Sequence, residues 1–335
     1  MTGLRVAVLA GGPSSEAAVS RASAAAVEVA LQRAGHSPAV LPLSSELPAA
    51  LRGQPYDVVF PVTHGPLGED GCVQGLLEVL DLPYVGSGVM ASAIAASKPH
   101  AKTIFRAAGV PVAPDAIVRR GEHFDGTATR LRRELGQALV VKPASGGSAI
   151  GVTRVAGAAP DAAVTQALQS ALDGDPVALV EPLVDGSEVT CGVLELDERG
   201  PFALPPTLIV ARAAEFYSFE AKYARGGSEH RCPAGFPDEL TQRIQQAAVA
   251  AHRAVGARDL SRVDFIVGSA ARGHALTTLE LNTLPGMTET SLYPEAALAF
   301  GIDFATLCDG LVRRAHARPR RSIPDVVPIP PPLTG

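Results

Sequence analysis

Two short apolar runs near the start of the chain, with a helix-prone stretch between them, set the fold class of this region. Residues 4–10 (LRVAVLA) and 56–62 (YDVVFPV) have the length and hydrophobicity of strands buried in a parallel sheet. Residues 20–33 are rich in alanine and lead to Gly35, which is typical of a helix end. Because strands alternate with helices here, we expect an α/β layer with a parallel sheet.

The later part of the chain carries further strand signals. Four short runs have strand character: 138–142, 151–155, 178–181 and 188–196. Two more runs, 262–267 and 276–281, are separated by a turn that contains glycine and arginine, which predicts a hairpin. Helices are expected over 99–108, 241–255 and 304–312, and no internal repeat is present.

Composition excludes several classes of protein. The 335 residues are 47% hydrophobic with a net charge of −5, which is enough for two or three domains and argues against nucleic-acid and membrane-surface partners. The sequence contains no run of 18 apolar residues, so no membrane span is predicted, and no signal sequence is evident. The four cysteines form no CxxC pair, so we expect a reduced, cytoplasmic protein with cysteines that fill its core.

Lysine is rare in this sequence, and its positions are informative. Only four of the 29 basic residues are lysines, at positions 98, 102, 142 and 222, which is consistent with a codon bias towards arginine. None follows a glycine, so a Gly-Lys-Ser/Thr phosphate loop is excluded. The first turn reads AGGPSSEA rather than GxGxxG, so a dinucleotide fold is not supported either. Lysines that are retained under such a bias are candidates for residues that bind a ligand or take part in catalysis.

The predicted hairpin brings carboxylates together. Side chains two apart share a face of a strand, so the apolar residues Val263, Phe265, Val267, Leu279 and Leu281 are expected to point one way. Antiparallel pairing could then place Asp264, Glu280 and Asn282 on the other face, beside Arg262. Hard oxygen ligands without thiol or imidazole suit Mg²⁺ rather than zinc. The alternative interpretation is a solvated strand face with an incidental salt bridge.

Two lysines lie where phosphate could bind. Lys142 stands at the mouth of the loop 143–150, whose adjacent glycines let backbone N–H groups approach an anion, although the loop could equally be an ordinary hairpin connection. Lys98 falls at the start of a predicted helix, where a phosphate would remove the conflict between its charge and the helix dipole. The alternative for Lys98, and for Lys102 one turn later, is a solvated lysine.

Three acidic residues and one histidine complete the candidates. Glu181 and Glu188 flank residues 184–186 and could accept hydrogen bonds from a nucleoside. Glu16 follows the first turn and is either a site residue or a partner of the helix dipole. His64, after the second apolar run, lies where ligands bind in α/β sheets.

Taken together, these positions resemble one family. The strings HGPLGEDGCVQG (64–75), PYVGSGVMAS (83–92) and ELNTLPGMTETS (280–291) are specific in combination. With LAGGPSSEAAVS (9–20), VVKPASGGSAIGV (140–152), FYSFEAKY (216–223) and SRVDFIV (261–267), they are similar to the D-alanine–D-alanine ligases of the ATP-grasp superfamily across about residues 4–315.

The resemblance implies a fold and a reaction. The fold is of the α/β class, with α+β character in its ATP-binding part: a Rossmann-like N-terminal domain (1–97), then a central domain (98–182) and a C-terminal domain (183–318) whose antiparallel sheets clasp ATP. Residues 319–335 form a proline-rich tail that is expected to be disordered. The expected partners are ATP, D-alanine and a second copy in a homodimer. The first D-alanine carboxylate takes the γ-phosphoryl group of ATP, and the second D-alanine amine displaces phosphate.

The resemblance also implies roles for individual residues. The ATP contacts are Lys98, Lys142, Gly147, Ser148, Glu181, Val184, Glu188 and Lys222. Two Mg²⁺ ions, with Mn²⁺ as an alternative, are held by Asp264, Glu280 and Asn282. The catalytic and amino-acid contacts are Glu16, Ser148, Tyr223, Arg262, Gly286 and Ser291, with His64 and Leu292 as further candidates. Tyr223 matches family members that accept an amine rather than D-lactate.

The chain departs from the family pattern in two places. Ala17 replaces an arginine after the first turn, and Gly146-Gly147-Ser148-Ala149 replaces a loop that reads Glu-Gly-Ser-Ser. All implied lysines and metal ligands remain, so we expect an active ligase. The departures leave open a paralogue that uses another D-amino acid or a hydroxy acid. They also leave open a nucleotide-binding regulatory protein without turnover, which would not need Arg262.

Overall fold

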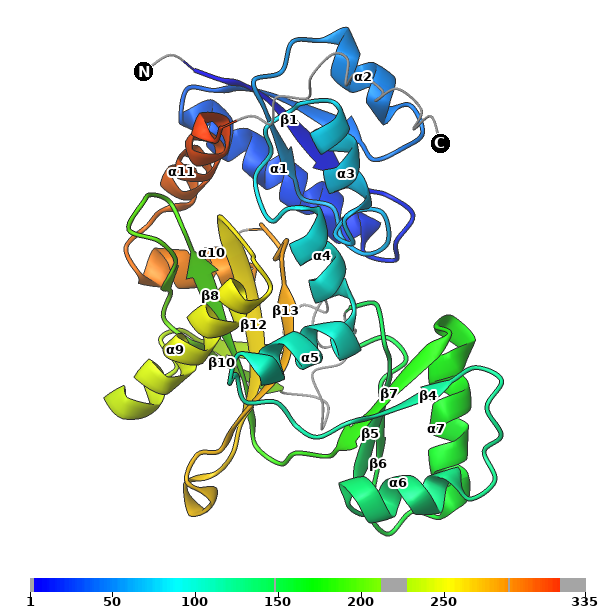
Figure 1. The fold of residues 1–335 in the computed structure, drawn as a ribbon. Coiled ribbons are helices and arrows are strands. Elements are labelled where there is room, and N and C mark those ends of the chain that lie inside the picture. Colours follow the sequence, from blue (N-terminus) through cyan, green and yellow to red (C-terminus); the bar gives the residue numbers. More distant parts are fainter. Residues whose placement is uncertain (1–2, 148, 212–227, 289, 320–335) are drawn as a thin grey trace, which may run out of the picture.

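The computed structural model describes residues 3–147, 149–211, 228–288 and 290–319. A parallel sheet lies at the N-terminal end of the molecule, in the order β2-β1-β3 (Figure 1). Its strands are β1 (Arg5–Ala10), β2 (Ser37–Pro42) and β3 (Val58–Pro61). The helices of this region are α1 (Ala17–Arg33), α2 (Leu47–Gly53), α3 (Cys72–Val79) and α4 (Val89–Ala96), and α5 (Lys98–Ala107) leads out of it. The predicted α/β layer is confirmed.

The middle of the chain forms an antiparallel sheet in the order β4-β7-β5-β6. Its elements are β4 (Ala116–Arg119), α6 (Thr127–Leu135), β5 (Leu139–Pro143), β6 (Thr153–Val155), α7 (Asp161–Gly174) and β7 (Val177–Pro182). Helices α6 and α7 pack on this sheet around a separate hydrophobic core that includes Leu131, Val141 and Leu168. Figure 1 shows this part as a separate green lobe.

The last part of the chain forms a second antiparallel sheet, in the order β11-β10-β8-β12-β13, with β9 paired to β8. Its strands are β8 (Ser187–Leu194), β9 (Phe202–Ala203), β10 (Thr207–Ala211), β11 (Ser228–Arg231), β12 (Leu260–Val267) and β13 (Leu276–Asn282). A short 3₁₀ turn, η1 (Ala270–Arg272), lies between β12 and β13. The helices are α9 (Asp238–Ala254), α10 (Leu292–Ala299) and α11 (Phe304–Ala317). The hairpin predicted from residues 262–281 is confirmed as β12 and β13.

The N-terminal sheet shares a hydrophobic core with the C-terminal part of the chain. Val8 and Phe60 of the parallel sheet belong to the same buried cluster as Tyr293 of α10 and Leu311 of α11. Helix α11 lies beside α1 (Figure 1). These two parts therefore pack as one body, whereas the middle sheet has its own core. The domain bounds expected from the sequence stay a prediction.

A β-bulge changes one detail of the predicted hairpin. Asp264 pairs with Glu280, but Phe265 pairs with Thr278, so Leu279 is an extra residue in β13. Leu281 is buried in the core with Val263 and Phe265, whereas Leu279 lines a cavity next to Glu280. The expectation that Leu279 shares a face with Leu281 is therefore wrong, because the bulge interrupts the alternation.

The cysteines only partly follow expectation. Cys191 and Cys308 are buried in the core, and Cys232 is half-buried. Cys72, the first residue of α3, is exposed, so it does not fill the core as expected. The chain's cysteines are free in this structure. Among the helices that the structure describes, none is both long and apolar enough to cross a membrane. The proline-rich tail beyond residue 319 lies outside the described residues.

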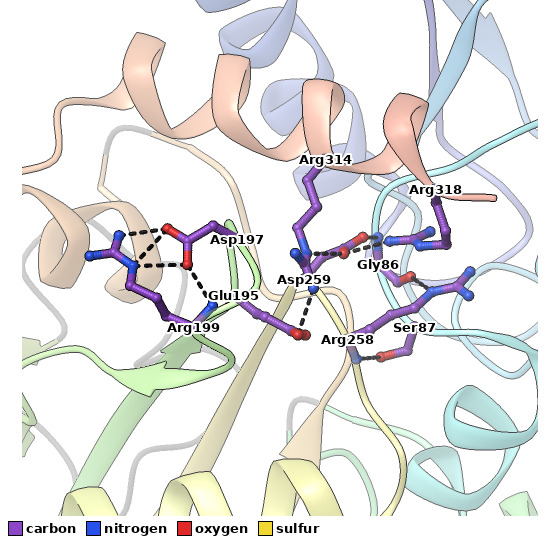
Figure 2. Close-up of polar contacts among 9 residues, drawn as sticks. All are labelled: Gly86, Ser87, Glu195, Asp197, Arg199, Arg258, Asp259, Arg314 and Arg318. Atoms are coloured by element: carbon purple, nitrogen blue, oxygen red, sulfur yellow. Dashed lines mark hydrogen bonds and ion pairs between the residues drawn. The ribbon is translucent and has the colours of Figure 1, made fainter.

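Asp259 forms the polar centre of the contact between the N-terminal and C-terminal parts (Figure 2). Its carboxylate is fully buried, and one oxygen accepts a hydrogen bond from the backbone N–H of Gly86 at 2.8 Å. The other oxygen lies 2.5 Å from Arg318 and 3.3 Å from Arg314. Two arginines at the end of α11 therefore anchor this helix to the segment that contains Gly86.

Neighbouring contacts strengthen the same joint. Arg258 donates from its side chain to the carbonyl oxygen of Gly86 at 2.8 Å, and its guanidinium lies 4.9 Å from the ring centre of Tyr84. A carboxylate oxygen of Glu195 forms an ion pair with the guanidinium of Arg314 at 2.5 Å (Figure 2). Gly86 has a φ of 98°, and a Cβ there would lie 3.0 Å from Leu284. The PYVGSG motif thus serves this joint between the two parts.

Replacing Asp259 with asparagine is expected to lower the free energy of unfolding by about 2 kcal/mol, because buried hydrogen bonds to a charged group are lost. Urea unfolding measures this loss. The control is Asp57→Asn, which breaks a partly exposed pair with Arg5 and should cost less than about 1 kcal/mol. Equal losses for the two variants would contradict a special role for Asp259.

His252 makes stability depend on pH. It is buried beneath β12, with Nδ1 at 2.8 Å from the Ser261 hydroxyl, and burial lowers the pKa of the imidazole to about 4. The unfolded chain binds the proton with a pKa near 6.5, so stability from this group is full above pH 6.5 and is lost as pH falls towards 4.

When the pH falls from 7.5 to 5, this difference between the folded and unfolded pKa of His252 should lower the free energy of unfolding by about 2 kcal/mol. Urea unfolding measures the free energy of unfolding at the two pH values. The same pair of measurements on His252→Asn isolates the contribution of His252 to the pH dependence. The variant should lose about 2 kcal/mol less than the parent on acidification. An identical loss in both proteins would mean that His252 titrates normally.

Candidate active site

The first cavity lies between the two antiparallel sheets. Its walls come from β5, β6 and β7 on one side and from β8, β12 and β13 on the other. Apolar side chains, including Val140, Val152 and Leu279, cover much of its surface. Charged groups gather at one end, where Lys98, Lys142 and Glu280 meet the loop of residues 145–150. An apolar slot that ends in cations suits a nucleotide, with the base in the slot and the phosphates at the lysines.

Helix α5 is tied to the glycine loop at its first residue. The backbone N–H of Lys98 donates to the carbonyl oxygen of Ala144 at 2.9 Å, and its ammonium donates to the carbonyl oxygen of Gly146 at 2.5 Å. The same ammonium lies 3.1 Å from a carboxylate oxygen of Glu280. Lys98 is thus fixed between the glycine loop and the carboxylate of Glu280.

Lys142, the next-to-last residue of β5, lies beside Glu181 of β7. Both side chains are buried, at 6% and 4% exposure, and the ammonium of Lys142 pairs with one carboxylate oxygen of Glu181. Val184 and Glu188 follow along the same wall of the cavity. The structure therefore brings Lys98, Lys142, Gly147, Glu181, Val184 and Glu188 together around one cavity, as the sequence predicted.

The hairpin places its polar residues as expected. Asp264 lies opposite Glu280, and Arg262 lies opposite Asn282. The guanidinium of Arg262 contacts both carboxylate oxygens of Asp264 at 2.9 Å, and the Thr190 hydroxyl donates to Asp264 at 2.7 Å. The expected grouping of these side chains on one face is confirmed.

This donor set fits magnesium. Asp264 and Glu280 supply carboxylate oxygens from facing strands, and Asn282 supplies an amide oxygen two residues along. Both carboxylates are paired with cations here, Asp264 with Arg262 and Glu280 with Lys98. Within the described residues, no three His, Cys, Asp or Glu side chains form a metal site. Asp264, Glu280 and Asn282 together offer two carboxylates and one amide, and these oxygen donors suit a hard cation rather than zinc.

A second cavity of about 530 Å³ adjoins the first. It is lined by Glu16, His64, Arg262, Gly286, Ser291 and Leu292, which come from the N-terminal and C-terminal parts of the chain. Gly147, Glu188 and Glu280 line both cavities. A Cβ on Gly147 would lie 3.6 Å from the Glu16 carboxylate, so the glycine loop passes close above Glu16. The two cavities therefore meet at Gly147, Glu188 and Glu280.

His64 is buried at the floor of the second cavity. Its Nε2 has no hydrogen-bond partner among the described residues. Burial lowers the pKa of the imidazole, and Arg262 adds to this effect while Glu16 opposes it. His64 is therefore neutral at pH 7 and is ready to exchange a hydrogen bond with a ligand.

The opposite wall of the second cavity is the start of α10. Ser291 precedes this helix, and its hydroxyl accepts a hydrogen bond from the backbone N–H of Thr288 at 3.0 Å. A Cβ on Gly286 would lie 3.0 Å from the Ser291 hydroxyl, so the two residues adjoin. Free N–H groups at a helix start attract carboxylates. Ser291 and Leu292 thus line the second cavity with Gly286, and their role towards a carboxylate stays a prediction.

Three predicted residues lie outside the described residues: Ser148, Lys222 and Tyr223. The sequence reasoning also missed Glu69, which lines the second cavity. Burial, with Glu16 and Glu280 nearby, raises the pKa of Glu69 to about 7. Its carboxylate accepts a hydrogen bond from the backbone N–H of Gly65 at 2.8 Å. Glu69 belongs to the HGPLGEDG string (64–71), so the motif itself carries the signal for this residue.

Comparisons with known proteins agree with this geometry. The family model described as "D-ala D-ala ligase C-terminus" matches residues 104–313, and "D-ala D-ala ligase N-terminus" matches residues 44–87. A D-alanine–D-alanine ligase of Geobacter sulfurreducens is 42% identical over 94% of this chain and 95% of its own length. One of Pelotomaculum thermopropionicum is 41% identical over 93% of this chain and 96% of its own length.

Solved structures give the same result. The D-alanine–D-alanine ligase from Coxiella burnetii matches with a TM-score of 0.78 and 28% identity, over 93% of this chain and 95% of that one. The D-alanine–D-alanine ligase from Bacillus anthracis, complexed with ATP, matches with a TM-score of 0.77 and 28% identity. The match covers 93% of this chain and 97% of that one. The expected ATP-grasp fold is confirmed. The chain belongs to the D-alanine–D-alanine ligase family.

Proposed function

We propose that this enzyme joins two D-alanine molecules at the expense of ATP. A carboxylate oxygen of the first D-alanine forms a bond to the γ-phosphorus, and ADP leaves. The amine of the second D-alanine then attacks the acyl carbon, loses a proton, and inorganic phosphate leaves with the former carboxylate oxygen. The observation that carries this proposal is the junction of the two cavities at Gly147, Glu188 and Glu280, where a phosphoryl group can pass from nucleotide to amino acid.

The lysines hold the nucleotide in this scheme. Lys98 and Lys142 lie at the charged end of the first cavity, where they neutralise the phosphates and keep the transferred group aligned. Glu181 and the Val184 backbone face the base, and Glu188 faces the ribose. Gly147, with Ser148 next to it, closes over the phosphates and excludes water.

The metal site belongs to the same proposal. Asp264, Glu280 and Asn282 would hold Mg²⁺, and the family resemblance leads us to expect two ions. The metal supplies positive charge that offsets the charge of the transferred phosphoryl group. Before the metal binds, Arg262 and Lys98 hold the two carboxylates in place.

The second cavity receives the amino acids. Glu16 accepts the ammonium group of the first D-alanine, and His64 lies close to the acyl phosphate. Arg262 and the Gly286 N–H stabilise the oxyanion that forms when the amine attacks. The start of α10, at Ser291 and Leu292, holds the carboxylate of the second D-alanine.

Acceptor choice is the part of the proposal that needs an experiment most. Phosphate release is measured with ATP and Mg²⁺ in the presence of D-alanine, other D-amino acids and D-lactate. We expect D-alanine to give the highest kcat/KM and D-alanyl-D-alanine as the product. The named relatives give no support to another acceptor. Absence of D-alanine-dependent phosphate release would refute the proposal.

Two further properties are proposed from the family resemblance: a homodimer and a cytoplasmic location. Light scattering coupled to size-exclusion chromatography measures the first directly. A mass near 69 kDa, twice the 34.5 kDa of one chain, is the expected result.

A further inference from the structure

Lys102 is buried next to the nucleotide cavity but does not line it. It lies one turn after Lys98 on α5, and its side chain is 1% exposed. The residues around the first cavity include Lys98, Lys142 and Glu181 but not Lys102. A lysine is rarely buried so completely unless carboxylates pair with it. We therefore expect Lys102 to act on the cavity through the residues that line it.

Glu181 is shared by two lysines. Lys102 pairs with one of its carboxylate oxygens, and Lys142 pairs with the other. Lys102 also lies 3.2 Å from Asp115, which Arg106 contacts on its outer side at 2.5 Å. Burial alone would raise the pKa of Glu181, but Lys142 and Lys102 together hold it below its usual value. Glu181 is therefore an anion with a cation on each oxygen.

The two lysines differ in what else they can reach. Lys142 faces the cavity, where a nucleotide phosphate would compete with Glu181 for its ammonium group. Lys102 pairs with Glu181 and Asp115 and is not among the residues that line the cavity. If Lys142 moves towards a phosphate, Glu181 would be a buried carboxylate without a partner unless Lys102 remained. An unpaired buried charge is strongly unfavourable.

We propose that Lys102 is a positioning residue that keeps Glu181 anionic and oriented while Lys142 turns to the nucleotide. The inference rests on the proposed function, since it assumes that ATP occupies the first cavity. A carboxylate held in this way accepts a hydrogen bond from the amino group of adenine and disfavours the carbonyl that guanine presents at the same place. Lys102 thus acts on nucleotide affinity and base choice, through Glu181 and Lys142.

The test compares Lys102→Met with the parent enzyme. Methionine keeps the length and volume of the side chain but removes its charge. We expect the KM for ATP and the Kd for ATP, measured by calorimetry without amino acids, to rise about tenfold or more. The preference for ATP over GTP should fall by a similar factor. The kcat and the KM for D-alanine should stay within about threefold, because the amino-acid cavity is unaltered.

Three further variants separate positioning from general destabilisation. Lys102→Arg retains the charge and should restore most of the ATP affinity. Arg106→Ala removes the outer end of the same ionic network and should leave the KM for ATP unchanged. In a Glu181→Gln background, Lys102→Met should add less than about twofold to the KM for ATP, because its route of action is already lost.

The possible results distinguish the role of Lys102 from the proposed function of the enzyme. Unchanged ATP affinity and unchanged base preference in Lys102→Met would overturn the inference, as would an equal rise in the KM for D-alanine. If Lys102→Met does not fold, Lys102→Gln is judged by the same criteria with a threefold threshold. ATP binding by the parent without D-alanine-dependent turnover would refute only the proposed function. Normal turnover with unchanged ATP affinity in the variant would refute only the role of Lys102.

Discussion

Glu280→Gln is expected to lower kcat for D-alanine-dependent phosphate release by about a hundredfold or more. Glu280 lines both cavities, lies opposite Asp264, and is 3.1 Å from the ammonium of Lys98. Glutamine preserves its shape and removes one negative charge from the centre of the site. With that charge lost, a divalent cation binds less tightly, and Lys98 loses the partner that aims it at the phosphates.

The measurement is the dependence of turnover on Mg²⁺ concentration. The variant should need at least about ten times more Mg²⁺ for half-maximal activity, and excess Mg²⁺ should restore part of the lost turnover. Asp197→Asn is the matched control, because it makes the same chemical change in an exposed pair with Arg199. The control should behave like the parent enzyme. Near-normal activity of Glu280→Gln at low Mg²⁺ would contradict the assignment of Glu280 as a metal ligand.

Local periodicity was sufficient to predict the hairpin of β12 and β13. The alternation of Val263, Asp264 and Phe265 determines which side chains enter the core, and the hydrophobic effect enforces it. The facing positions of Asp264 and Glu280 follow from antiparallel pairing. The bulge that turns Leu279 into the nucleotide cavity leaves no mark in the pattern, because it depends on how β13 fits against β12.

Long-range contacts were beyond the reach of the sequence. Asp259 and Arg318 are 59 residues apart, and Asp259 and Gly86 are 173 apart, so no local pattern indicates that they form one buried cluster. Lys102 was equally ambiguous, since an isolated lysine at a helical position is usually solvated. Its role became visible only when the fold brought Glu181 and Asp115 to the same point. Ionic networks of this kind depend on tertiary structure rather than on spacing.

Arg262→Met is expected to lower kcat by about a thousandfold and to leave the KM for ATP within about threefold of the parent value. Arg262 and Gly286 both line the second cavity, where the oxyanion of the second step would form. Methionine removes every donor of the side chain while it keeps comparable bulk. Arg262→Lys should recover little activity, because an ammonium group cannot reproduce the planar fork of arginine.

The same variant distinguishes two roles for Arg262, because the guanidinium also contacts both oxygens of Asp264 at 2.9 Å. If Arg262 stabilises the oxyanion, turnover falls while the Mg²⁺ concentration for half-maximal activity stays near the parent value, since the Thr190 hydroxyl still holds Asp264. If Arg262 serves only to orient Asp264, the Mg²⁺ requirement rises as it does in Glu280→Gln. We expect the first result, because the metal itself can replace the guanidinium as the cation next to Asp264, whereas no other described arginine or lysine lines the amino-acid cavity.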